Sequence, residues 1–369
     1  MEDATDDLVP LDWDQVEARA ARGDTSHLRE LGARLADRRE AAAEQAREYG
    51  RHLAHVVRVL ALTRGRDSLT QLLRLLDEKQ ASTGLHPRFV ASLLAEHQEP
   101  ADLAAVVFDR PHTDRLDELR GCLFHELILR GVDIDDFRPL RTWTIVRPGW
   151  SALAWLPDQL RAMETAVDFP GRSLRGSARG GGSGLPTEGR MDPPTPRTSR
   201  RSALQDVATT AVHTSIVAAP EAGDWGNHGA WVFRLDEAIA PKRVPALLPT
   251  LPMPCVDGLG PTARFEIAAR PVDEIWRLLF ATASMGGMYG EGVHGAYGRL
   301  WAWRSMAGLS GTAEGASAED VERHANQSTW FHFEADAEWF HNDVCADYGI
   351  AALSPDRRRL AVLAATDTD

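Results

Sequence analysis

Cysteine is rare in this chain, and its scarcity excludes two ways of stabilising a protein. The 369 residues include three cysteines, Cys122, Cys255 and Cys345, which are odd in number and far apart. No CxxC motif and no paired Cys/His spacing occurs. A disulfide framework or a structural zinc site would need such spacing. We therefore expect a reducing compartment.

Long apolar runs and a secretory leader are also missing. A membrane span needs about eighteen consecutive apolar residues, and no stretch comes close to that. The amino terminus, MEDATDD, is acidic where a secretory signal has a basic start and an apolar run. These features predict a cytoplasmic protein that does not contact a membrane.

Positive charge is in deficit, since the formal net charge is −13. A field of this sign keeps a protein soluble and repels phosphate backbones, so a nucleic-acid partner is not expected. Lys is scarce while Arg and Ala are abundant, a bias typical of high-GC bacterial genomes. Hydrophobic residues make up 43% and charged residues 26%, as in globular proteins. The length suits two domains.

Residues 1–169 show the period of amphipathic helices joined by short turns. Asp12 is placed to cap a helix that begins at Trp13. Pro87 and Pro100 stand where helices can begin. One clear apolar stripe consists of Leu69, Leu72, Leu73 and Leu76. We predict a helical domain of stacked hairpins, either a bundle or solenoid-like, although no known repeat signature is legible.

The helical pattern stops between residues 170 and 202. Gly, Pro, Ser and Arg dominate this segment, and apolar periodicity is lost. Such a composition buries too little apolar surface to offset the entropy of ordering the chain. We predict a disordered, locally basic linker, or alternatively a long loop inserted in a single domain.

Residues 203–369 mix helical and strand patterns. The predicted helices are 204–219, 271–284 and 296–309, and the predicted strands are 231–235, 264–268 and 329–333. Near the carboxyl terminus, two apolar runs flank the Pro355-Asp356 turn, which predicts a β-hairpin. The fold class that we predict is α+β, predominantly helical, with the helical domain followed by an α+β region.

A glycine-rich window, 286–298, is the first candidate site. Gly290, Gly292 and Gly295 match GxGxxG, but a dinucleotide site needs a strand before this motif, and the preceding segment has a helical pattern. A close-packed bend between two helices explains the glycines equally well. The polar side chains of the window nevertheless suit a ligand-binding loop. The candidate ligand-binding residues are Tyr289, Glu291, His294 and Tyr297.

Two further clusters carry aromatic and titratable side chains. The loop GDWGNHGAW presents Trp225 and His228 as ligand-binding candidates, although it is also typical of a turn into a strand. His332, together with His341 and Asp343, provides two imidazoles and a carboxylate, the donor types of a metal triad. Their spacing matches no strong ligand motif, and an aromatic strand with polar groups on one face is the alternative. We expect no cofactor.

The stretches YGEGVHGAYGRLWAWRSMAGL and GIAALSPDRRRLAVLAATDTD resemble segments of an uncharacterised actinobacterial family, a domain of unknown function. The resemblance covers mainly the last hundred residues and implies no activity. No complete catalytic constellation is legible, which favours a non-enzymatic protein-binding or regulatory protein with a protein partner or self-association. The alternatives are a small-molecule enzyme or ligand-binding protein that uses the glycine-rich loop, and an immunity or defence-associated factor.

Overall fold

The chain folds into two compact units. The computed structural model describes residues 11–367 except 42, 84, 110–115, 166, 168, 170, 174–175, 179–202, 260–262, 288–289 and 341–346. The first unit comprises Met1–Ala154 and Pro170–Ala178, and the second comprises Trp155–Phe169 and Arg179–Asp369. Of the predicted linker, only 171–173 and 176–178 are described; they pair as strands β1 (Gly171–Ser173) and β2 (Gly176–Ala178). The rest of the linker lies outside the described residues.

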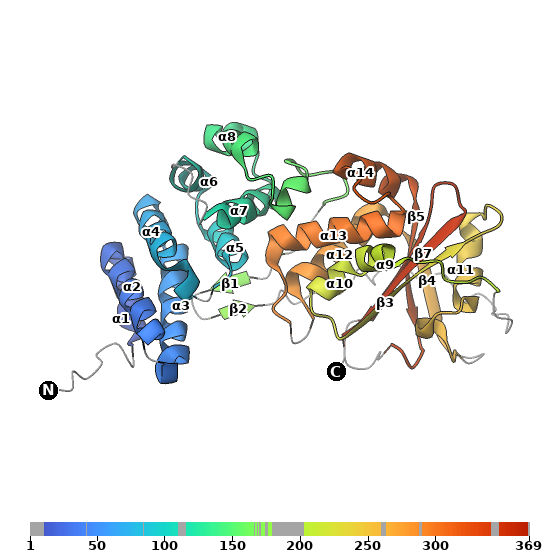
Figure 1. The fold of residues 1–369 in the computed structure, drawn as a ribbon, viewed down its shortest axis with the longest axis horizontal. Coiled ribbons are helices and arrows are strands. Elements are labelled where there is room, and N and C mark those ends of the chain that lie inside the picture. Colours follow the sequence, from blue (N-terminus) through green and yellow to red (C-terminus); the bar gives the residue numbers. More distant parts are fainter. Residues whose placement is uncertain are drawn as a thin grey trace. The chain divides into compact units, whose positions relative to one another are not determined.

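The first unit consists mainly of helices that pack on one another (Figure 1). The helices are α1 (Trp13–Ala21), α2 (Thr25–Ala41), α3 (Ala46–Leu62), α4 (Arg66–Thr83), α5 (Pro87–His97), α6 (Pro100–Leu103), α7 (Asp117–Leu129) and α8 (Arg138–Val146). Asp12 caps α1 by accepting hydrogen bonds from the backbone N–H groups of Asp14 and Gln15. Pro87 and Pro100 are the first residues of their helices. The starts that the sequence predicts are therefore confirmed.

The second unit is built on a five-stranded antiparallel sheet with the order β3-β7-β6-β5-β4. Its strands are β3 (Asn227–Arg234), β4 (Phe265–Arg270), β5 (Thr329–Ala335), β6 (Asp347–Leu353) and β7 (Arg359–Thr366). The hairpin predicted at the carboxyl terminus is formed by β6 and β7, and its turn is closed by the Ser354 N–H, which donates to the Arg359 carbonyl at 2.9 Å. The fold is thus α+β and predominantly helical, as predicted.

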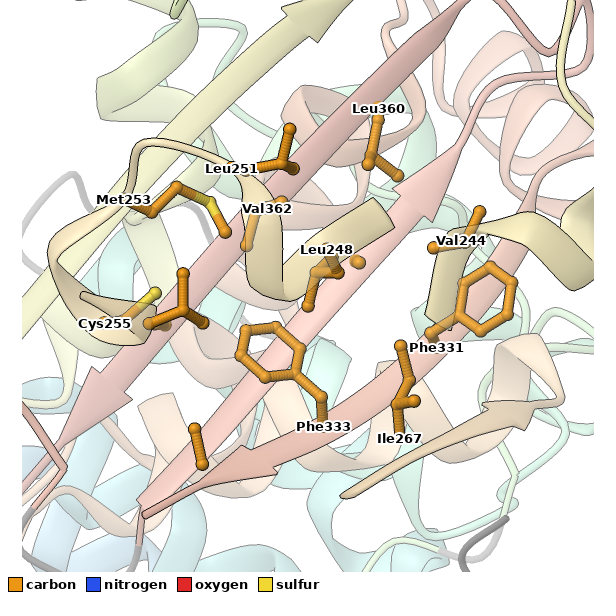
Figure 2. Packing of buried hydrophobic residues seen from close by; sticks show 14 of the residues in the cluster. Val244, Leu248, Leu251, Met253, Cys255, Ile267, Phe331, Phe333, Leu360 and Val362 are labelled. Atoms are coloured by element: carbon orange, nitrogen blue, oxygen red, sulfur yellow. The ribbon is translucent and has the colours of Figure 1, made fainter. Parts of the chain in front are cut away.

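Each face of the sheet is covered, so most strand residues on both faces are buried. One face packs against the segment that contains α11 (Val244–Leu247), where Phe331, Phe333 and Val362 meet Leu248 and Met253 (Figure 2). Helices of this unit cover the other face (Figure 1). They include α9 (Thr210–Ile216), α10 (Ala218–Ala222), α12 (Val272–Met285) and α13 (His294–Ser310), with α14 (Ala318–Gln327) against α13. Among the described helices, none combines the length and the apolar character needed to cross a bilayer.

One buried ion pair joins the segment Trp155–Phe169 to α13. Arg299 donates from Nε and Nη2 to the two carboxylate oxygens of Glu164, at 2.6 and 2.7 Å, and neither side chain has any solvent exposure. The indole of Trp303 donates to the same carboxylate at 2.6 Å, as does the Arg161 N–H at 2.9 Å. Arg299 also donates to the carbonyls of Pro157 and Gln159. The segment is thereby fixed to the second unit.

Removal of one partner of this pair is expected to destabilise the second unit strongly. Arg299→Met leaves the Glu164 carboxylate buried without its main donor, at a cost of about 3–5 kcal/mol. Calorimetric unfolding of the full chain measures the loss. The double variant Arg299→Met/Glu164→Leu should lose less than the sum of the two single variants, because it leaves no uncompensated charge. Arg323→Met, which removes an exposed pair with Asp320, is the control. Additive losses would contradict a coupled pair.

Candidate functional site

The glycine-rich loop between α12 and α13 packs closely against the protein's own backbone. A side chain at Gly286, Gly290 or Gly292 would lie within 2.7 Å of a backbone atom, including the Gly223 carbonyl oxygen beside Gly290 and the Ser284 carbonyl oxygen beside Gly292. Gly286 and Gly292 also have positive φ values, 76° and 64°. Glycine is therefore required here both for conformation and for close approach. Gly290 and Gly292, two of the three glycines of GxGxxG, thus face carbonyl groups of neighbouring segments.

The structure brings two of the predicted sites together. The Gly287 N–H donates to the Gly223 carbonyl at 2.8 Å, which joins the glycine-rich loop to the turn that carries Trp225. The Trp225 indole donates to the Thr282 carbonyl of α12 at 3.1 Å and lies edge-on to Tyr348 of β6. The two segments are separate candidates in the sequence, and the fold makes them neighbours.

Backbone strain is concentrated where these loops meet. Three described residues other than glycine have positive φ, and two of them are Asp224 (56°) and His294 (62°). The third, Arg357, lies in the β6–β7 turn. Asp224 precedes Trp225, and His294 begins α13. Non-glycine residues in this conformation cost free energy and often cluster at ligand sites, so the contact between the two loops is a candidate site for a small ligand.

The candidate side chains differ in how far a ligand can reach them. Glu291 is exposed, Tyr297 is partly exposed and His294 is buried. His228 is partly exposed at the start of β3, and burial lowers its pKa. Tyr289 lies outside the described residues. The described part of the loop therefore offers one exposed carboxylate, Glu291, and one partly exposed ring, Tyr297.

The second predicted cluster is only partly described. His332 and Glu334 occupy the same face of β5, as their alternate spacing predicts. His332 is 3% exposed, and within the described chain neither of its ring nitrogens has a hydrogen-bond partner. Burial, with the Arg270 charge, lowers the pKa of His332 to about 4. Burial raises the pKa of Glu334, although Arg264 donates to it at 3.2 Å.

His341 and Asp343 lie outside the described residues. Among the residues that are described, no group of three or more histidine, cysteine or carboxylate side chains is arranged to hold a metal ion. The metal triad therefore stays a prediction.

An exposed apolar surface on α8 is a feature that the sequence analysis missed. Ile145 is 84% exposed, Val146 52% and Trp150 72%. Leu140 and Trp143 of the same helix are buried. The sequence does indicate this exposure, because Ile145 lies outside the apolar helical face that Leu140 and Trp143 define. We call Arg138, Arg141, Ile145, Val146 and Trp150 the α8 surface.

A helical unit and an antiparallel sheet covered by helices place the molecule among α+β proteins. A model of a family of unknown function (DUF6183) matches residues 12–369, and the chain belongs to this family. The sequence resemblance had implied a likeness mainly in the last hundred residues. The family match instead covers nearly the whole chain. No curated protein and no solved structure matches.

The close packing at the start of α13 makes a strong test position. A Cβ atom at Gly298 would lie 2.6 Å from the Ser284 Cβ and 3.0 Å from its Cα. Gly298→Ala should therefore destabilise the protein by about 1–3 kcal/mol, although Ala is the better helix former. Thermal unfolding measures the change. Gly149→Ala, where nothing lies within 4 Å, is the control; equal stability of both variants would contradict the close packing.

His332 is expected to make stability fall in acid. Its folded pKa of about 4 lies below the ordinary 6.5, so between these pH values the unfolded chain binds the extra proton. Stability is then lost as pH falls from 6.5 to 4, by about 3 kcal/mol at most. His332→Leu should remove this part of the pH dependence in denaturant titrations, while His213→Leu, at a partly exposed position, should keep it. An unchanged slope in His332→Leu would refute the assignment.

Proposed function

We propose that this protein is a binding protein that docks a protein partner on the α8 surface. The observation that carries the proposal is the exposure of Ile145, Val146 and Trp150. Six large hydrophobic side chains are exposed in the described chain, and these three lie within six residues of one another. Single exposed apolar residues are ordinary, whereas a contiguous group marks an interaction surface.

The α8 surface is held on a well-packed support. The Trp143 ring lies edge-on to Phe108, with centroids 5.9 Å apart, and the Arg120 guanidinium lies over the same ring at 5.9 Å. Arg120 is itself buried, and its Nε donates to the Val107 carbonyl at 3.0 Å. Because its buried face is packed, the helix loses little conformational entropy when its exposed face binds a partner, and this favours affinity.

Trp150 and Ile145 are suited to act as anchors. Burial of a large apolar side chain contributes roughly 1.5–3 kcal/mol. Tryptophan is among the residues most enriched at the energetic centre of interfaces. In the free protein, both side chains leave most of their surface in water, so a partner that covers them gains this contribution.

The glycine-rich loop has weaker support as a binding site. A Cβ atom added at Gly286, Gly290 or Gly292 would lie within 2.7 Å of the protein's own backbone. Close packing of the chain accounts for them, so a ligand is not needed to explain their presence. We therefore rank a small-molecule enzyme or ligand-binding protein below a protein-binding role. A defence-associated role, a cytoplasmic location and an actinobacterial origin stay predictions.

The proposal predicts that partners are lost when the anchors are removed. Full-length tagged protein carrying Ile145→Ser and Trp150→Ser should recover its partners at least about tenfold less than the unchanged protein, since two anchors contribute several kcal/mol. Quantitative mass spectrometry after affinity purification measures the recovery. Leu160→Ser with Val207→Ser removes exposed apolar side chains elsewhere and should leave recovery unchanged. If no recovered protein depends on the α8 surface, the proposal fails.

A further inference from the structure

We infer that the segment docking on the α8 surface is an acidic polypeptide with an apolar anchor. This inference rests on the proposed function and names the class of partner. It follows from the charges that surround the apolar anchors.

Two arginines lie on the same exposed face of α8 as Ile145. Arg138 and Arg141 are three residues apart, and Arg141 precedes Ile145 by four, so the three side chains follow one another along the helix. Both arginines are exposed. Within the described residues, neither guanidinium has an ion pair or a hydrogen bond. They are therefore available to carboxylates of a partner, to which a guanidinium binds through paired hydrogen bonds.

Three carboxylates precede α8, at the end where Arg138 lies, and the buried Asp117 lines a pocket with Trp143 and Arg147 near the other end. Asp133 precedes the helix and accepts a hydrogen bond from the Asp135 N–H, and Asp135 and Asp136 are exposed beside it. Ile145 and Val146 close the helix, and Trp150 follows them. Arg141 is therefore nearer to the apolar anchors along the helix than any of the three preceding carboxylates. Although the chain has a net charge of −13, the exposed Arg141 supplies positive charge next to Ile145, and positive charge attracts an acidic partner.

A nucleic acid fits the same surface less well. The net charge of −13 repels a phosphate backbone at longer range. Of the three anchors only Trp150 can stack on a base, whereas Ile145 and Val146, the nearest to Arg141 in sequence, are aliphatic. Aliphatic anchors with adjacent guanidinium groups match a polypeptide that places Asp or Glu beside Leu, Ile or an aromatic residue.

Selection from a random peptide library displayed on phage tests the inference, because it does not require the partner to be identified first. The full-length protein is the target, and the Ile145→Ser/Trp150→Ser variant removes peptides that bind elsewhere. We expect the remaining peptides to carry acidic residues beside apolar ones. One such peptide, labelled for fluorescence anisotropy, should bind at least about tenfold less tightly to Arg138→Glu/Arg141→Glu. Arg34→Glu/Arg38→Glu, an exposed pair on α2, should bind it unchanged.

The outcomes separate the inference from the proposed function. Peptides that depend on the anchors but are neutral or basic would overturn the acidic partner and leave a protein-binding surface. Acidic peptides whose affinity is equal for both arginine variants would likewise overturn the role of Arg138 and Arg141. If no enriched peptide depends on Ile145 and Trp150, both the inference and the proposed function fail.

Discussion

The ion pair between Glu164 and Arg299 is the interaction on which the arrangement of the second unit depends. Neither charge is stable in a solvent-free interior alone, because desolvation costs each several kcal/mol. The cost is offset only when every donor and acceptor is used. Glu164 accepts from Arg299, Trp303 and Arg161, and Arg299 also reaches two carbonyl groups. The pair thus specifies one position for Trp155–Phe169, and this segment belongs to the second unit, ahead of the predicted linker.

Helix α13 connects this pair to the rest of the unit. Beside Arg299, Gly298 allows α12 to approach, and further along, Gly308 allows the backbone of Ile216 in α9 to come close. At the carboxyl end, the Arg359 guanidinium of β7 donates to the carbonyls of Leu309 and Gly308 at 2.7 and 2.8 Å. These bonds add donors to carbonyl groups in the last turn of the helix, where intrahelical donors run out. One helix therefore fixes the segment, the helical layer and the sheet relative to one another.

Local patterns in the sequence predicted the elements well, whereas partners distant in sequence could not be predicted. The β6–β7 hairpin follows from two apolar runs and a turn. The predicted helix 204–219 is wrong in its first half, because Asp206 instead forms a bridge to Phe233 and accepts from the Val232 N–H. The spacing placed His332 and Glu334 on one face of the strand, but it did not predict that His332 is buried. The adjacency of Trp225 and the glycine-rich loop likewise depends on tertiary packing.

A contrast between buried and exposed charges bears on how sites are found in such a protein. Perturbed or buried ionisable groups are often sought as functional residues. Here Arg299 and Glu164 are fully buried, and their hydrogen bonds hold the chain's own segments, so their burial is explained by folding. Arg141 and Ile145 are exposed to solvent. Nothing in the fold of the described residues requires an exposed isoleucine next to an exposed arginine. In this molecule, the residues left unexplained by folding are the better guide to function.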